Sequence, residues 1–242
     1  MIYYLLCPIK IMRILFILIL FCGTNTVYGQ NVINVDKQSE TVDNSIFYNS
    51  GGVPFVNAKY VRLVEGTPYF KDAWLKASLL TTKDQLCKNI PVKLDLVDND
   101  IHYLDKDGNE MVSISSFKEM VLHDSISNIS YHFTFFSKNI QGYRKGWYQV
   151  LYSGNKISLF KYYNKNVIES SPYGSATAEQ HIFTSDNYFI FFNDKITTIK
   201  KEKDILYAFK DKEKELNQLL KDHKFSSTEE KFTALVQYFD SH

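Results

Sequence analysis

The sequence predicts an α+β protein that is mainly β: an antiparallel β-meander forming an open barrel or curled sheet, followed by two short C-terminal helices. Short stretches of alternating apolar and polar residues, separated by Gly, Asn and Asp, recur from residue 58 to residue 200. This pattern is typical of strands joined by tight turns. From residue 201 the apolar residues recur every three or four positions, which indicates helices.

These patterns divide the chain into four segments. We expect residues 1–29 to be a signal peptide and the polar residues 30–57 to be a poorly ordered lead-in. Residues 58–200 are expected to form the antiparallel β domain. Residues 201–242 are expected to form a helical segment that packs on the sheet, because its apolar faces need a surface to cover.

The strand pattern is clearest in three stretches. Apolar side chains alternate with polar ones in residues 91–97 and 129–136, so one face of each strand is expected to be buried. Residues 188–192 are apolar throughout, which predicts burial on both faces. Residues 105–109 and 153–155 carry the residue types of hairpin turns.

The helical segment shows a start signal as well as a helical period. Ser227 and Glu230 form a capping box, which predicts the beginning of the last helix. The apolar residues at helical spacing are Ile205, Phe209, Leu216, Leu219 and Leu220 in the first helix, and Phe232, Leu235, Val236 and Phe239 in the second.

The N-terminus has the pattern of a secretory signal peptide. Lys10 and Arg13 precede the apolar run 14–21, and Gly29 ends a plausible cleavage site. Met12 would begin a more ordinary signal than the first residue does. We therefore expect a secreted or periplasmic protein, cleaved near Gly29.

The cysteines argue against a lipid anchor and an intrachain disulfide. Lipid attachment needs a cysteine after a small residue, whereas Cys7 follows Leu6 and Cys22 follows Phe21. Only Cys87 remains after cleavage. A single cysteine in an exported chain is typically a buried, small apolar side chain.

Charge and hydropathy exclude two further classes. The chain has 28 Lys and Arg against 27 Asp and Glu, and after cleavage its arginines are Arg62 and Arg144. A nucleic-acid-binding protein would be expected to carry a basic, Arg-rich face. No later apolar run approaches the length of a membrane span, so we expect no transmembrane segment in the mature chain.

The stretch GTPYFKDAWLKASL has two interpretations. Gly66 and Pro68 indicate a change of chain direction before a strand. Tyr69, Phe70 and Trp74 then either close one end of the sheet, as a structural corner, or border the mouth of a ligand site. The structural interpretation is favoured.

Aromatic residues are numerous, with 17 Tyr and 18 Phe, and they gather between residues 143 and 173. They would serve as a stacking surface for sugar, as an apolar cavity for lipid, or as ordinary cross-strand packing, which we favour. The candidate ligand-binding residues are Tyr69, Phe70, Trp74, Trp147 and Tyr148.

An acidic cluster in residues 98–110 resembles a calcium loop only superficially. In the sequence that starts at Asp105, Gly108 comes at the fourth position and Ser116 at the twelfth, where an EF-hand has glycine at the sixth and glutamate at the twelfth. A hairpin turn accounts for the same residues. We expect no metal site here.

Catalytic signatures are missing from the sequence. It contains no Gly-x-Ser-x-Gly elbow and no Gly-rich phosphate loop before a helix. His123 and His132 lie on successive predicted strands, where solvated or structural histidines are expected. Glu119, Glu169 and Glu179 would pair as glycosidase carboxylates only if the fold placed them together. We therefore predict no catalytic residues and no cofactor.

Two stretches carry a resemblance to a known group of proteins. They are Gly66–Phe70 with Trp74, and Tyr148–Leu151 with Gly154–Lys156. Over residues 58–242 the chain resembles an uncharacterised family of secreted or periplasmic β-rich proteins of Bacteroidota, although such proteins often have a glycine soon after the tryptophan. The resemblance implies export in a Gram-negative bacterium and a β-rich body, and brings no established activity.

The sequence thus favours an exported, non-enzymatic envelope or interaction protein whose partner is an unknown envelope protein. The alternative is a binding protein for a lipid or another apolar small molecule in a β-barrel-like cavity. A second alternative is an envelope hydrolase. The binding protein predicts an apolar cavity, and the interaction protein predicts a filled core with an exposed apolar patch.

Overall fold

The computed structural model describes residues 52–56, 59–137, 143–171 and 177–242, together with residues 42, 44, 45, 48, 173 and 174. The expected signal peptide, residues 1–29, lies outside the described residues, as does most of the expected lead-in. The described residues belong to one compact unit.

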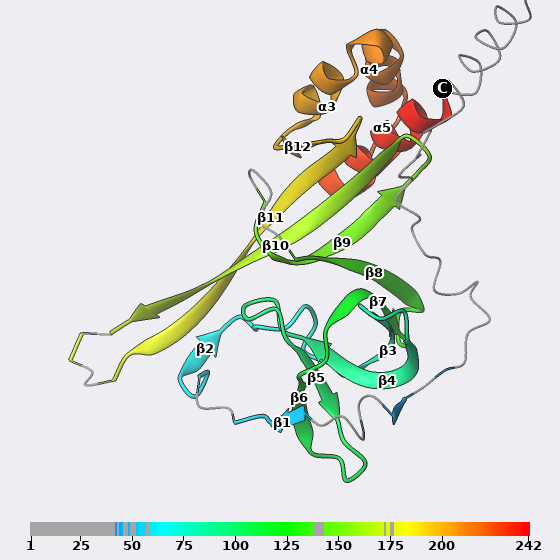
Figure 1. The fold of residues 1–242 in the computed structure, drawn as a ribbon. Coiled ribbons are helices and arrows are strands. Elements are labelled where there is room, and N and C mark those ends of the chain that lie inside the picture. The colour runs from blue at the N-terminus through cyan, green and yellow to red at the C-terminus, as the bar shows by residue number, and fades with distance from the viewer. Residues whose placement is uncertain are drawn as a thin grey trace, which may run out of the picture. The chain divides into compact units, whose positions relative to one another are not determined.

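The described residues form one open, mainly antiparallel sheet of twelve strands, which confirms the predicted fold class (Figure 1). Its strands follow the order β1-β6-β5-β4-β3-β7-β8-β9-β10-β11-β12, and β2 pairs in parallel with β11. The strands are β1 (Gly52–Pro54), β2 (Leu63–Glu65), β3 (Leu75–Thr81), β4 (Leu86–Leu94), β5 (Ile101–Leu104), β6 (Glu110–Ser113), β7 (Phe117–Asp124), β8 (Ile129–Phe136), β9 (Gly146–Ser153), β10 (Ile157–Ser170), β11 (Glu179–Phe192) and β12 (Lys195–Ile199).

The first part of the sheet, β1 and β3–β8, is called the curled region here because these strands bend around a common interior (Figure 1). Its core is built from the inward faces of β3, β4, β5, β7 and β8 and includes Trp147 at the start of β9. Cys87 is fully buried in this core, as expected for a small apolar side chain. The strands themselves supply both sides of the core.

The second part, β9–β12 with the C-terminal helices, is called the helix-covered region. The helices are α3 (Glu202–Ala208), α4 (Glu213–Asp222) and α5 (Thr228–Ser241), with a short 3₁₀ turn at Lys210–Lys212. The first of the two expected helical segments is therefore divided, because the turn interrupts it after Phe209. The helices cover one face of β9–β12 (Figure 1).

Residues 188–192 are buried on both faces, as their continuous apolar character predicts. Tyr188 and Ile190 belong to the core beneath the helices, whereas Phe189 packs on the opposite face with Tyr143 and Tyr148. The predicted beginning of α5 is confirmed, because the Ser227 hydroxyl accepts a hydrogen bond from the backbone N–H of Glu230. The capping box is only half formed, because the Glu230 carboxylate accepts from the backbone N–H of Ser226, one residue before the cap.

The hairpin of β10 and β11 is longer than its neighbours. Its two strands pair from Ile157↔Phe192 to Ser170↔Glu179, whereas β9 pairs only with Ser158–Lys161 and β12 only with Tyr188–Phe192. The remainder, called the ribbon (162–170 and 179–187), extends beyond both neighbours (Figure 1).

The inner face of the ribbon packs on the Gly-Thr-Pro turn. Gly66 has φ +84°, and a Cβ there would lie 2.2 Å from the carbonyl oxygen of Ile182. Lys165 donates a hydrogen bond to the Thr67 carbonyl oxygen at 2.8 Å. The turn is therefore a corner held between the curled region and the ribbon.

Two local expectations differ from the structure. The expected β domain begins at residue 58, but residues 59–62 form a turn and the first strand in it is β2, Leu63–Glu65. Gly52–Pro54, in the expected lead-in, forms the edge strand β1 on β6. None of the helices in the described part of the chain combines the length and apolar character that a membrane crossing needs.

Candidate functional site

The five candidate ligand-binding residues lie in several different environments. Trp147 is buried in the core of the curled region, with its ring edge-to-face with Phe135, and Phe70 packs against the same core. Tyr148 points to the opposite side of β9, into the aromatic cluster with Phe189. Tyr69 and Trp74 lie on the outer side of the curled region, beside Lys93. The structure thus does not bring the five together.

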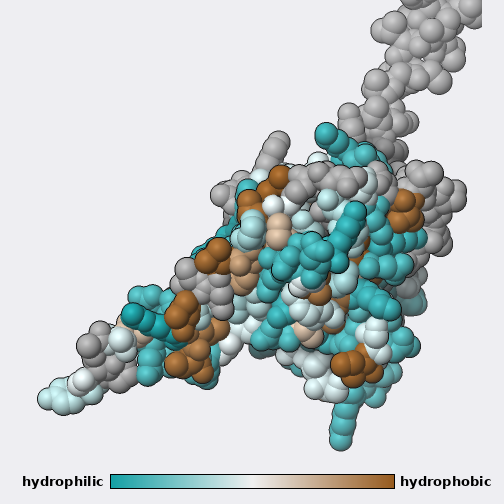
Figure 2. Space-filling view, turned by 90° about the horizontal axis from the view of Figure 1, so that it is seen from below, coloured by the Kyte–Doolittle hydropathy of each residue, from teal (hydrophilic) through white to brown (hydrophobic). Residues whose placement is uncertain are grey.

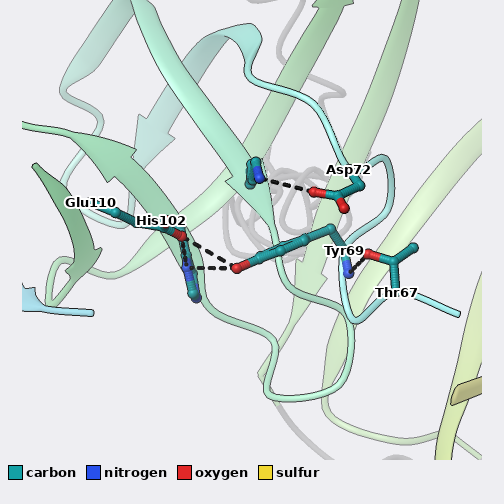
Figure 3. A network of polar contacts seen from close by, with 6 residues as sticks. Thr67, Tyr69, Asp72, His102 and Glu110 are labelled. Atoms are coloured by element: carbon teal, nitrogen blue, oxygen red, sulfur yellow. Dashed lines mark hydrogen bonds and ion pairs between the residues drawn. The ribbon is translucent and has the colours of Figure 1, made fainter. Parts of the chain in front are cut away.

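A buried polar network surrounds Tyr69 (Figure 3). His102 is 2% exposed, and its Nδ1 lies 2.8 Å from Oε1 of Glu110. The Tyr69 hydroxyl donates to the same carboxylate oxygen at 3.3 Å, and the ring of Phe55 lies 4.5 Å from the His102 ring. Burial and the Glu110 carboxylate raise the pKa of Tyr69 well above its usual range, so the phenol stays protonated.

Lys93 lies beside the rings of Tyr69 and Trp74. Its ammonium lies 4.8 Å from the Tyr69 ring centre, 5.2 Å from that of Trp74 and 2.9 Å from Asp72 Oδ1. Lys93 therefore contacts both rings, of which Tyr69 is buried and Trp74 is partly exposed. The interpretation of Tyr69 and Trp74 as a structural corner stays a prediction.

A pocket of about 340 Å³ lies where the curled sheet ends. It is bordered by the starts of β5, β7 and β9 and the ends of β6 and β8. Its apolar wall consists of Ile101, Phe117, Phe135 and Trp147. Its polar lining consists of Thr82, Asn99, Asp100, Ser113, Ser115, Ser116, Ser137 and Lys145. This is the candidate functional site.

The pocket exists because the curl brings β5 back against β9. The two strands are separated by β4, β3, β7 and β8 in the order of the sheet. Asn99, just before β5, accepts a hydrogen bond from the backbone N–H of Trp147 through Oδ1 at 3.2 Å. A Cβ at Gly146 would lie 2.5 Å from that oxygen, so the contact requires glycine. Asn99 itself has φ +63°, which asparagine tolerates better than most residues.

One acid and one base line the pocket. The protein around the Asp100 carboxyl group, together with the nearby Asp98 carboxylate, raises the pKa of Asp100 above its usual value. Lys145 extends over the pocket wall, with its ammonium 5.9 Å from the centre of the Phe135 ring. The pocket can therefore accept hydrogen bonds at one place and donate them at another, next to an apolar wall.

Sequence reasoning found Trp147 and missed most of the polar lining. Asp100 entered only as part of an acidic cluster, and the hydroxyl groups come from four separate loops or strand ends. The Asp98-Asn99-Asp100 turn carries the one local signal, an asparagine between two acids that favours a left-handed backbone.

The other sequence candidates lie away from this pocket. Residues 105–109 form the expected turn, in which Asp105 Oδ1 accepts backbone N–H bonds from Asp107 and Asn109 at 2.9 and 2.8 Å. His123 pairs across the sheet with Ser130, and His132 pairs with Val121. Within the described residues, no three His, Cys, Asp or Glu side chains gather as metal ligands would.

The three glutamates considered as hydrolase carboxylates are not gathered either. Glu119 lies on β7, where burial raises its pKa, whereas Glu169 and Glu179 lie at the far end of the ribbon. Glu169 accepts a hydrogen bond from the Gln180 side chain at 3.1 Å.

Comparison of the chain with protein-family models, with curated proteins and with solved structures finds no match.

Proposed function

We propose that this chain is an exported binding protein that holds a small molecule, or a small group displayed by a partner, in the pocket at the end of the curled sheet. The observation that carries the proposal is the pocket lining. Hydroxyl, amide, carboxylate and ammonium groups converge there beside an aromatic wall within about 340 Å³. A few convergent polar groups on an apolar wall are typical of small-ligand sites.

The sequence supports export through its N-terminal pattern of basic residues, apolar run and cleavage site. The resemblance to secreted or periplasmic β-rich proteins of Bacteroidota supports the same location. The mature chain would then meet its ligand outside the cytoplasm, in the periplasm or beyond the cell.

The geometry favours a different ligand from the lipid expected of a closed barrel. The sheet is open, so the site is a pocket at its end and not the interior of a barrel. A lipid chain would bury the polar lining without satisfying its hydrogen bonds, which costs free energy. An amphipathic ligand with several polar groups would satisfy them.

A second function, binding a protein partner, is favoured by the outer face of the ribbon. Ile168 is 50% exposed and Phe183 is 49% exposed, on neighbouring strands. Figure 2 shows apolar side chains gathered among polar ones on this projecting part of the molecule. Such exposed apolar residues often mark contact surfaces. A partner captured by the intact chain and lost in Phe183→Ser would support this function.

The first function is tested by native mass spectrometry of residues 30–242 purified without detergent from the exported fraction. We expect an adduct that persists under native conditions and disappears on denaturation. Thr82→Phe places a ring at the exposed rim of the pocket and should remove the adduct. Thr184→Phe, also exposed but on β11, is the matched control and should keep it. An adduct present equally in both variants would contradict binding in this pocket.

A further inference from the structure

The hydroxyl groups of the pocket are its most unusual feature. Thr82, Ser113, Ser115, Ser116 and Ser137 come from four strand ends or loops and line one small space. A hydroxyl donates one hydrogen bond and accepts others, so it adapts to a ligand group that also does both. A ligand rich in hydroxyl groups matches this lining better than one with only acceptors or only donors.

The carboxylate and the amide of the pocket can also bind a ligand that is rich in hydroxyl groups. Asp100 carries a carboxylate, which accepts hydrogen bonds only, and Asn99 carries an amide that both donates and accepts. Two neighbouring hydroxyl groups of one ligand can both donate to one carboxylate. These bonds are charge-assisted and therefore stronger than bonds between neutral groups.

The charged groups of the pocket favour a neutral ligand. Asp100 and Lys145 are the acid and the cation among the residues that line it. The neighbouring Asp98 carboxylate forms an ion pair with Lys59, so its charge is balanced by a protein group. A neutral ligand suits this balanced lining, because it can donate hydrogen bonds to the carboxylate and accept one from the ammonium.

The apolar wall gives the ligand a preferred face. Phe135 is half-buried and contacts the buried ring of Trp147, so part of its surface faces the pocket. A sugar ring has C–H groups on its faces and hydroxyl groups around its rim, and such a ring can lie against an aromatic wall while its rim meets polar groups. The volume of about 340 Å³ is at the small end of ligand pockets, which suits one or two rings.

We infer that the pocket binds a neutral sugar residue, either free or at the end of a glycan, with Asp100 accepting hydrogen bonds from its hydroxyl groups and Phe135 contacting its apolar face. This inference rests on the proposed binding function and specifies its ligand class.

Tryptophan fluorescence can test this inference. Trp74 and Trp147 are the two tryptophans of the chain, and Trp147 lines the pocket. Trp74→Phe in residues 30–242 therefore leaves emission that reports on the pocket wall. The probes are the common neutral hexoses, their N-acetylated amino forms and their disaccharides. Glycine, alanine and octanoate represent the zwitterionic and lipid classes.

The expected result is a saturable change in emission with at least one of the sugars. Asp100→Asn should weaken that binding by about tenfold or more, because it replaces a charge-assisted acceptor with a neutral amide. The backbone carbonyl of Asp100, which accepts a bond from the Asp95 N–H, is unchanged in this variant. Asp107→Asn makes the same charge change in the exposed turn and should bind as the parent does.

The failures of the two proposals are distinguishable. Saturable binding of octanoate or an amino acid, with no sugar bound, would overturn the sugar assignment and keep the pocket as a binding site. Sugar binding that Asp100→Asn leaves unchanged would also overturn the assignment to this pocket. No response to any probe, together with a mass-spectrometric adduct that Thr82→Phe does not remove, would overturn both.

Discussion

The curled region and the helix-covered region bury their apolar residues in different ways. In the curled region the strands β3–β8 bend until their inward side chains meet one another. In the helix-covered region the strands do not close around their own side chains, and α3, α4 and α5 cover one face of the sheet instead. The difference explains where the pocket lies, because a curled sheet leaves space at its end, whereas helices fill the face that they cover.

The two regions are tied together at several points. Within the helix-covered region, Lys161 on β10 forms ion pairs with Asp186 at 2.9 Å and with Glu229 of α5 at 3.0 Å, which join the ribbon to the helices. Lys165 and Gly66 join the ribbon to the curled region. These ties predict that both regions unfold together.

The strongest perturbation is expected from Phe232→Ala. Phe232 is 2% exposed, and its ring centre lies 5.1 Å from that of Tyr188. Removing it leaves a cavity between α5 and the sheet and should lower the free energy of unfolding by about 3–5 kcal/mol. Urea unfolding followed by circular dichroism measures this loss.

The same titration tests whether the two regions unfold together. Circular dichroism at the helical band reports on α3–α5, and tryptophan emission reports on Trp74 and Trp147 in or beside the curled region. The two transitions should coincide. Separate midpoints would show that the helix-covered region unfolds alone. Phe183→Ala, on the exposed face of the ribbon, is the control and should change stability little.

A smaller effect is expected at the corner between the regions. Gly66→Ala must place a Cβ against the Ile182 carbonyl oxygen in a left-handed backbone, and it should cost about 3 kcal/mol. Gly108→Ala is a matched control, since its φ of +82° is close to the +84° of Gly66 but nothing lies within 4 Å of its Cβ. It should cost only about 1–2 kcal/mol. Equal losses would show that the contact with the ribbon is not tight.

The sequence predicts the elements of both regions well, because each is specified locally. The β5–β6 turn at Asp105–Asn109, the β9–β10 turn at Ser153–Asn155 and the Ser227 cap depend on residues a few positions apart. The burial of residues 188–192 on both faces follows from their composition. The division between α3 and α4 was missed because the charged residues around Lys210–Lys212 fit a helix as well as a turn.

The pocket could not be predicted because it depends on the curl. Asn99 and Trp147 are 48 positions apart, and no periodic pattern connects them. The intervening strands also shift their register, as β3 does against β4 between Ala77 and Leu79, and such irregularities bend a strand. Aromatic content drew attention to Tyr69 and Tyr148, yet both are occupied by protein partners.

The smallest effect concerns acid sensitivity, and it compares one carboxylate from each region. In the curled region Asp124 accepts a hydrogen bond from the Lys71 ammonium at 2.7 Å, and this ion pair, with backbone N–H bonds from Ile126 and Ser127, holds the pKa of Asp124 well below its usual range. In the helix-covered region burial acts to raise the pKa of Asp240. Hydrogen bonds to its carboxylate, including one from the Lys156 backbone N–H, outweigh burial and lower the pKa.

A carboxyl group whose pKa is lowered by folding stabilises the fold at pH values above its unfolded pKa, which is about 3.9 for Asp. This stabilisation is lost as the pH falls through the pKa of the folded state. Asp124→Asn should therefore lower stability at pH 7 and reduce the loss that the parent shows between about pH 5 and about pH 2. Asp240→Asn should do the same to a lesser degree, because burial offsets part of the effect. Urea midpoints across this pH range compare the two. A larger change for Asp240→Asn would mean that the tie between α5 and the β9–β10 turn is the more acid-sensitive one.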